Sequence, residues 1–309
     1  MSDLGGYAAD YLALRRALGY KLTGEGRLLL DFVAFAQKAG AEKITTELAV
    51  AWATDTEGSS QAYLARRLRV VRSFARHLQA FEPTTEVPPG DLFPAGKHRP
   101  TPYIYTSADI AALMGAARGL RPALRAATFE TLIGLLASTG MRAGEAMNLD
   151  DGDINWDHSL LVIRQTKYNK SREVLLHPST LDALAAYKKT RDRLSPSRST
   201  AGFFVTTRRT RLSHTATQPT FRQLAIETRV GQAISSSRPR VHGFRHTFAV
   251  NTLLEWSADG GDVSARMPLL STYLGHSCPA ASYWYFTAVP ALLAIAAARR
   301  DRHYRKGRR

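Results

Sequence analysis

Apolar residues recur at helical spacing through the first quarter of the chain. Four stretches between residues 7 and 81 show this period: YAADYLALRRALG, RLLLDFVAFAQKAG, ELAVAWA and QAYLARRLRVVRSFARHLQAF. Side chains three and four positions apart lie on one face of an α-helix, so each stretch predicts a helix with one buried face. We therefore expect a helical domain over residues 1–84.

The fourth of these stretches carries a row of arginines beside its apolar face. Leu, Val and Phe fill that face, and arginines take other positions: Arg66, Arg67, Arg69, Arg72 and Arg76. A helix that packs on one side can present such cations to phosphates on the other. The candidate DNA-binding residues are Arg66, Arg69, Arg72 and Arg76. The alternative is a charged face that contacts only solvent.

A segment without an apolar period follows. Residues 85–102 are rich in proline, glycine and threonine, which predicts a linker between two domains. A helix is expected from TSADIAALMGAA, where Thr106 and Asp109 have the spacing of a capping box. The second domain then spans residues 103–309 and ends in a helix and a basic tail.

The second domain combines helical periods with one pair of short strands. SLLVIR and REVLLH are rich in β-branched residues, and QTKYNKS between them predicts a hairpin tip. Helices are expected afterwards at about 179–194, 217–230, 242–256, 266–275 and 279–300. The expected fold class is mainly α with a small β-sheet, in two domains: a helical N-terminal domain and a mixed α+β domain.

The net charge of the chain indicates the class of its partner. The 309 residues carry a formal net charge of +16 and a sequence pI near 10.3, and 44% of them are hydrophobic, which is enough for two cores. Basicity spread over a folded chain favours a polyanion partner such as double-stranded DNA. Charge that serves only solubility is the alternative.

Cysteine content and apolar run lengths indicate the compartment. Cys278 is the single cysteine of the sequence, so it has no internal partner for a disulfide, which is typical of a reducing compartment. No basic leader followed by an apolar run is present, and no stretch reaches the roughly 18 apolar residues of a membrane span. We expect a soluble cytoplasmic protein without a membrane partner.

The stretch VHGFRHTFA fits three kinds of site: a metal centre, a packed core or a phosphate-binding site. His242 and His246 are four apart, as in a zinc protease, but Gly243 stands where that motif needs a glutamate base. His242 and Arg245 are three apart and project toward one point from the first turn of a helix. A guanidinium binds two nonbridging oxygens, and a histidine can donate or exchange a proton, so phosphate binding is favoured.

The acidic stretch LDDGDINWD is a second candidate metal site. Counted from Asp151, Trp156 takes the sixth position and Val162 the twelfth, where a calcium loop has glycine and glutamate. We therefore expect a turn whose carboxylates face solvent.

Five motifs, in order, resemble those of the tyrosine recombinases, or phage integrases. STGMRAGEAMNL matches the family's arginine segment, RQTKYNKSREVLL its hairpin lysine and VHGFRHTFA its HxxRH motif. LLSTYLGHSCPAASYWYF supplies LGH at His276 and a tyrosine nine residues later, Tyr285. The resemblance covers essentially the whole chain, although the N-terminal part matches only in character.

The resemblance implies a role for four matched residues at the reacting phosphate. Arg142 and Arg245 would clamp its nonbridging oxygens, and Tyr285 would attack it as the nucleophile. Lys167 at the start of the hairpin tip would protonate the departing 5′ oxygen, with Lys170 as the competing lysine.

Three further residues complete the implied site. His242 would help to accept the tyrosine proton, His276 would hydrogen-bond the phosphate, and Glu145 would orient the site from behind it. Tyr283 is the alternative nucleophile, two positions short of the family spacing. His246 is expected to be a packing residue.

The resemblance also implies the reaction and the assembly. The family cleaves and rejoins DNA through a 3′-phosphotyrosine link, exchanges two duplexes through a Holliday junction and acts as a homo-tetramer, or with related recombinase subunits, on DNA. No cofactor, metal or small-molecule substrate is implied. The long segment SADGGDVSARMP is similar to that of recombinases encoded in sets by transposable elements, which adds transposition to integration and excision. The alternative functions are a type IB topoisomerase and a non-cutting accessory subunit. The expected location is the bacterial cytoplasm, at the nucleoid when the protein is bound to DNA.

Overall fold

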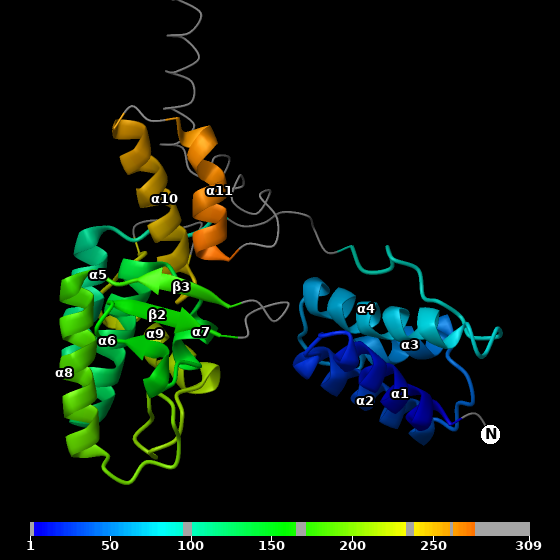
Figure 1. Ribbon diagram of the computed structural model, residues 1–309. Coiled ribbons are helices and arrows are strands. Elements are labelled where there is room, and N and C mark those ends of the chain that lie inside the picture. Colours follow the sequence, from blue (N-terminus) through cyan, green and yellow to red (C-terminus); the bar gives the residue numbers. More distant parts are fainter. Residues whose placement is uncertain (1–2, 95–100, 165–170, 233–237, 260–261, 276–309) are drawn as a thin grey trace, which may run out of the picture. The chain divides into compact units, whose positions relative to one another are not determined.

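The chain divides into two compact units, residues 1–99 and 100–309 (Figure 1). Each unit has its own hydrophobic core. The computed structural model describes residues 3–94, 101–164, 171–232, 238–259 and 262–275. Helices dominate both units, and a small sheet lies in the second. The predicted fold class is confirmed. None of the described helices is long and apolar enough to cross a membrane.

The helices predicted for the N-terminal part form the first unit. They are α1 (Leu4–Ala17), α2 (Thr23–Lys38), α3 (Thr46–Thr54) and α4 (Gln61–Leu78). Thr45 and Ser60 cap α3 and α4, because their side-chain oxygens accept hydrogen bonds from backbone N–H groups in the first turn. The core contains Phe32, Trp52 and Phe74, which are fully buried.

Arg67 does not lie on the charged face of α4, where the sequence placed it. Its guanidinium stacks over the Trp52 ring at 3.9 Å, and Nη2 donates to the Trp52 carbonyl oxygen at 2.7 Å. The ring, the carbonyl and the Asp31 carboxylate, 3.7 Å from Nη2, surround the buried cation, while its aliphatic stem adds to the core. The expectation of an outward-facing arginine is therefore wrong for Arg67.

The first part of the predicted linker packs on the first unit. Val87 and Phe93 contact its core. Arg72 of α4 donates from Nε to the Pro88 carbonyl at 2.7 Å and from Nη2 to the Pro89 carbonyl at 2.6 Å. Arg72 therefore fixes the chain as it leaves the unit, and the predicted domain limits remain a prediction.

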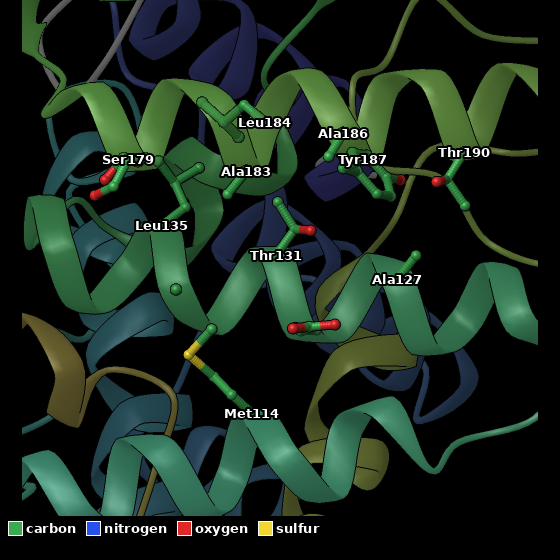
Figure 2. A pocket seen from close by; sticks show the side chains of 13 residues that line it. Met114, Ala127, Thr131, Leu135, Ser179, Ala183, Leu184, Ala186, Tyr187 and Thr190 are labelled. Atoms are coloured by element: carbon green, nitrogen blue, oxygen red, sulfur yellow. The ribbon is translucent and has the colours of Figure 1, made fainter.

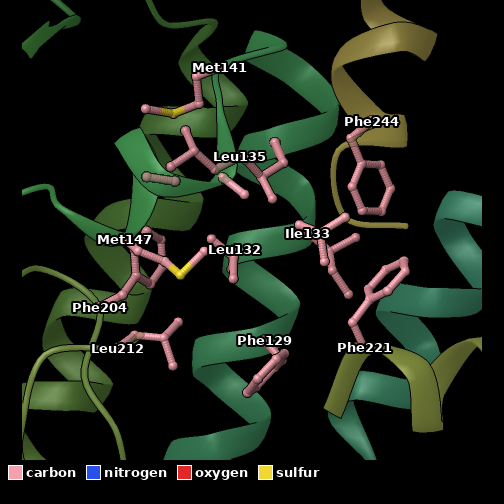
Figure 3. Packing of buried hydrophobic residues seen from close by; sticks show 14 of the residues in the cluster. Phe129, Leu132, Ile133, Leu135, Met141, Met147, Phe204, Leu212, Phe221 and Phe244 are labelled. Atoms are coloured by element: carbon pink, nitrogen blue, oxygen red, sulfur yellow. The ribbon is translucent and has the colours of Figure 1, made fainter. Parts of the chain in front are cut away.

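The second unit surrounds α6 with helices and a small sheet. Its elements are α5 (Ser107–Arg118), α6 (Ala123–Thr139), α7 (Ala143–Met147), the 3-10 turn η1 (Asp151–Asp153), β1 (Ile154–Asn155), β2 (Leu160–Ile163), β3 (Arg172–Leu175), α8 (Pro178–Leu194), α9 (His214–Glu227), α10 (Gly243–Ala258) and α11 (Val263–Leu274). Figure 3 shows α6 running between Met147 and Leu212 on one side and Phe221 and Phe244 on the other. This layer of apolar side chains is the support on which the site is built.

The strands form an antiparallel sheet in the order β1-β2-β3. Leu161 pairs with Val174, and Ile163 pairs with Arg172. Leu161, Ile163 and Val174 are buried, as the alternation of side chains along a strand requires. The predicted hairpin is confirmed, and its tip lies outside the described residues. The two-residue β1 is too short to show an alternating pattern and was not predicted.

Caps explain why two helices begin earlier than their apolar periods predict. α9 starts at residue 214 instead of 217, because the Ser213 side chain caps it. α11 starts at residue 263 instead of 266, because Asp262 accepts hydrogen bonds from its first turn. The predicted capping box of Thr106 and Asp109 is confirmed. The helix expected at 279–300 lies outside the described residues.

The acidic turn at η1 is bound to arginines, and the prediction of carboxylates facing solvent is wrong. Asp153 is buried and pairs with Arg164 at 2.7 Å. Asp151 accepts a hydrogen bond from Arg191 at 2.6 Å and another from Arg198. Arg191 and Arg198 lie 40 and 47 residues from Asp151, so the local sequence pattern carries no trace of them.

A groove of about 380 Å³ lies between α5, α6 and α8 (Figure 2). Small side chains such as Ala127 and Ala183 leave it open, and Met114 and Tyr187 border it. The described residues that line it include no lysine, arginine or histidine. It therefore offers no cation to a phosphate.

Candidate active site

The turn between α6 and α7 places Arg142. α6 ends at Gly140, whose φ of 59° lies in the left-handed region that favours glycine. A Cβ on this residue would lie 2.5 Å from Cδ1 of Phe248, so α10 packs directly against the turn. Arg142 is the N-cap of α7, and its backbone N–H donates to Oε2 of Glu145 at 2.8 Å.

The Arg142 side chain bridges two segments that are distant in the sequence. Nη1 donates to Oε1 of Glu145 at 2.7 Å, and Nη2 donates to the carbonyl oxygen of Gly275 at 2.7 Å. The side chain is 31% exposed, so solvent reaches it. Arg142 is therefore fixed by partners behind it and still open to a ligand.

Arg245 reaches the same place from α10. It lies in the first turn of that helix and is 2% exposed. Nη1 donates to the carbonyl of Gly140 at 3.1 Å, and Nη2 donates to the carbonyl of Leu274 at 2.6 Å. Arg142 and Arg245 thus hold two successive carbonyls, those of Leu274 and Gly275, where α11 ends.

The two histidines of the HxxRH motif differ in burial. His242 directly precedes α10 and is exposed, whereas His246 is buried, as expected for a packing residue. Their rings meet edge to face, with centroids 4.7 Å apart. A Cβ on Gly243 would lie 2.7 Å from the Tyr105 ring. The glutamate of the zinc protease motif therefore has no room at this position.

The remaining predicted site residues cannot be placed on this geometry. The following lie outside the described residues: Lys167, His276 and Tyr285, with the alternatives Lys170 and Tyr283. The sequence connects two of them to the described site, because His276 follows Gly275 directly and Lys167 belongs to the tip between β2 and β3.

Arg172 is a site residue that the sequence analysis missed. It opens β3, and its Nη1 and Nη2 donate to Oε1 and Oε2 of Glu145 at 3.0 and 2.7 Å. The signal was present in REVLLH, because alternate residues of a strand share a face and Val174 faces the core. A cation two residues from Val174 is on that same face, where it needs an anionic partner.

Glu145 is the carboxylate that receives both arginines. Its side chain is 9% exposed. Burial by itself raises its pKa, but hydrogen bonds and charge from Arg172, followed by the hydrogen bonds from Arg142, outweigh that effect and lower the pKa below its ordinary value. Glu145 is therefore an anion that pairs with two cations at the site, and the three groups together keep a positive charge.

The α4 arginines proposed to bind DNA have different surroundings. Arg69 and Arg76 are exposed. Arg66 is also exposed and pairs with Glu25 at 3.2 Å. Arg72 is half-buried and donates to the backbone carbonyls of Pro88 and Pro89. Arg69 and Arg76 are therefore the exposed arginines of this set that form no ion pair with another described residue.

Comparison with known proteins identifies the family to which this geometry belongs. The model of the phage integrase family matches residues 105–286, which is more than half of the chain. The chain belongs to the phage integrase family. A putative integrase/recombinase of Sinorhizobium fredii, y4rB, is 38% identical over 310 residues, covering 98% of this chain and 99% of that protein. The tyrosine recombinase XerD of Brucella abortus is 30% identical over 222 residues, 69% of each chain.

Solved structures of integrases and recombinases share the fold. The Tn1549 transposon integrase in complex with transposon right end DNA aligns with a TM-score of 0.64 and 16% identity over 98% of this chain and 99% of that one. The XerA recombinase aligns with a TM-score of 0.52 and 22% identity over 96% and 99%. The family model and the 30% identical XerD confirm the resemblance to tyrosine recombinases seen in the sequence motifs, and the solved structures show the shared fold.

Proposed function

We propose that this phage integrase family member is a site-specific recombinase that cleaves and rejoins double-stranded DNA through a 3′-phosphotyrosine intermediate. The convergence of Arg142 and Arg245 on the carbonyls of Leu274 and Gly275 carries the proposal. It draws three of the five sequence motifs to one point, immediately before His276. Two guanidiniums at one point suit the two nonbridging oxygens of a phosphodiester.

The proposed reaction is an in-line displacement at phosphorus. Oη of Tyr285 forms a bond to phosphorus, and the bond from phosphorus to the 5′ oxygen breaks. The tyrosine proton passes toward His242, and the 5′ oxygen takes a proton from Lys167. Rejoining is the reverse displacement by a 5′ hydroxyl. Because the phosphotyrosine ester conserves the energy of the broken phosphodiester bond, no ATP is consumed.

The arginines stabilise the charge that develops in this displacement. Negative charge spreads over the nonbridging oxygens, and fixed cations stabilise it without reorganisation. Arg142 and Arg245 supply two such cations, His276 a further hydrogen bond, and Glu145 holds Arg142 from behind. We propose that these groups make the reaction independent of a metal ion.

The proposed partner is double-stranded DNA. The net charge of +16 and the exposed arginines of α4 support an interface with phosphates. The proposed assembly is a homo-tetramer on DNA, or one with related recombinase subunits, in the bacterial cytoplasm. The fold shared with the Tn1549 transposon integrase supports a role in integration, excision or transposition of a mobile element.

Covalent trapping tests the nucleophile. The wild type, Tyr285→Phe, Tyr283→Phe and Tyr273→Phe are incubated in EDTA with end-labelled DNA from the ends of the element, nicked so that cleavage is trapped. We expect a covalent adduct on a denaturing gel from every protein except Tyr285→Phe. Tyr273 is the matched control, because it stacks on Phe248 and burial raises its pKa.

Each other outcome rejects a defined part of the proposal. An adduct from Tyr285→Phe, with none from Tyr283→Phe, moves the nucleophile to Tyr283. Tight DNA binding without an adduct from any protein supports an accessory subunit instead. Adducts that form only after magnesium is added contradict metal independence. Relaxation of supercoiled DNA without strand exchange between duplexes favours a topoisomerase.

A further inference from the structure

Glu145 is shared by two arginines, and the way they share it sets the direction of Arg142. Arg172 spans both carboxylate oxygens, at 3.0 Å to Oε1 and 2.7 Å to Oε2. Arg142 reaches Oε1 with its Nη1 at 2.7 Å, and its backbone N–H reaches Oε2 at 2.8 Å. The side chain of Arg142 thus has one nitrogen on the carboxylate, while that of Arg172 has two.

This arrangement leaves the second nitrogen of Arg142 for the site. Nη2 points to the carbonyl of Gly275, beside the predicted phosphate-binding residues. An arginine and a carboxylate on their own favour a fork with two parallel hydrogen bonds. Without Arg172, Glu145 has both oxygens available for such a fork, and Arg142 would turn Nη2 away from Gly275 and toward the carboxylate.

Burial makes the arrangement depend on Arg172. The side chains of Glu145 and Arg172 are 9% and 13% exposed, so water cannot fully replace a missing partner. Arg172 also lies close to Gly275, where a Cβ would be 2.9 Å from its Nη1 and 3.5 Å from Nη1 of Arg142. The two guanidiniums therefore flank the residue that precedes His276.

Arg172 also joins the hairpin to this arrangement. It pairs with Ile163 at the tip end of the β2–β3 ladder, and the chain between these two residues contains Lys167. Arg172 thus connects β3, the strand that follows Lys167, to the carboxylate of Glu145.

We propose that Arg172 is a positioning residue for the cleavage reaction: it occupies both oxygens of Glu145 and thereby keeps Arg142 turned toward the phosphate. The inference rests on the proposed function, because the readout is DNA cleavage. Arg172 acts through Glu145 and Arg142, so its effect disappears where Arg142 is already lost.

Single-turnover cleavage of the nicked DNA at saturating protein tests this. We expect Arg172→Ala to lower the rate of adduct formation about 10- to 100-fold, because a small misplacement of a catalytic group has an effect of this size. DNA affinity should change less than about threefold. Arg164→Ala is the matched control, since it removes an arginine–carboxylate pair with Asp153 beside the same sheet and should cleave within about twofold of the wild type.

A double-variant cycle separates positioning from a general structural role. In an Arg142→Lys background, adding Arg172→Ala should lower the rate less than about threefold, because the group that Arg172 directs has been replaced. An undiminished loss in that background overturns the proposal. Cleavage by Arg172→Ala within about twofold of the wild type overturns it as well.

Arg172→Lys keeps the test decisive if the alanine variant does not fold. Lysine retains the charge but lacks the planar fork, so we expect slower cleavage with a thermal midpoint close to that of the wild type. Wild-type cleavage by Arg172→Lys overturns the proposal. If the wild type itself forms no Tyr285-dependent adduct, the proposed function fails and the inference fails with it; normal cleavage by the Arg172 variants rejects the inference alone.

Discussion

Gly140 shows how a single residue sets the position of both arginines. Its positive φ ends α6, its carbonyl accepts a hydrogen bond from Arg245, and the chain continues from it to Arg142. Gly140→Ala should lower the free energy of unfolding by about 1–3 kcal/mol from backbone strain, with a further loss from the overlap with Phe248. Urea denaturation of the wild type and the variant measures this difference.

Gly115 provides the opposite case for the same substitution. It lies within α5, and a Cβ there would meet no atom within 4 Å. Gly115→Ala should raise the free energy of unfolding by about 0.5–1 kcal/mol, because alanine loses less conformational entropy in a helix. Equal destabilisation by both variants would contradict the role assigned to the backbone at Gly140.

At the scale of elements, α4 uses its arginines in two ways. Arg67 is part of the core, while Arg69 and Arg76 are exposed. If each exposed arginine contacts one phosphate, the double variant Arg69→Ala/Arg76→Ala should reduce the slope of log K against log salt concentration by about 1.8, since each contact contributes about 0.9. Binding isotherms from low to physiological salt give the slope.

Charge-preserving substitutions control this experiment. Arg69→Lys/Arg76→Lys retains both cations and should keep the wild-type slope, because counterion release depends on charge. A wild-type slope in the alanine variant would show that α4 does not contact phosphates, and would favour the alternative of a solvated charged face.

The elements also show what the sequence could predict and what it could not. The helices of the first unit and the β2–β3 hairpin were predictable, because amphipathic periods and turn residues are local signals. The placement of Arg67 was not, since the helical period does not distinguish a cation that stacks on Trp52 from one that faces solvent. Helix starts were missed by three residues where Ser213 and Asp262 cap them.

The candidate site also contains features that local sequence signals predict and features that they do not. The family resemblance assigned Arg142, Arg245 and Glu145 to one site, because each of them lies in a short stretch that matches a family motif. Their hydrogen bonds to the end of α11 and to Arg172 join residues far apart in the chain, and they depend on how α6, α10 and the hairpin pack. No local pattern records such pairs.

At the scale of the whole molecule, ion pairs around the buried side chain of Arg191 make the stability of the second unit depend on pH. Asp192 accepts hydrogen bonds from Lys188, Arg191 and Arg198, and Arg191 also binds Asp151 of η1. The network therefore joins α8 to the turn before the sheet. Burial raises the pKa of Asp192, but hydrogen bonds from Lys188 and Arg191 outweigh it and bring the pKa to about 2.

The sign of the pH effect follows from this shift. The ordinary pKa of an aspartate is about 3.9, so Asp192 is deprotonated in the folded state at pH values where the unfolded chain already binds the proton. Its contribution to stability is fully present above about pH 4 and is lost as the pH falls toward 2. Glu145, whose pKa is also lowered, loses its contribution in the same direction.

Thermal melts from pH 2 to pH 6 test this dependence. The midpoint of the wild type should fall between pH 4 and pH 2, and Asp192→Asn should start lower at pH 6 and fall less, because it lacks the titrating carboxylate. Asp182→Asn removes an exposed carboxylate from the same helix and should follow the wild type. Because each unit has its own core, the change belongs to the transition of the second unit. Parallel curves for the wild type and Asp192→Asn would show that this network does not bind the proton differently in the folded and unfolded chains.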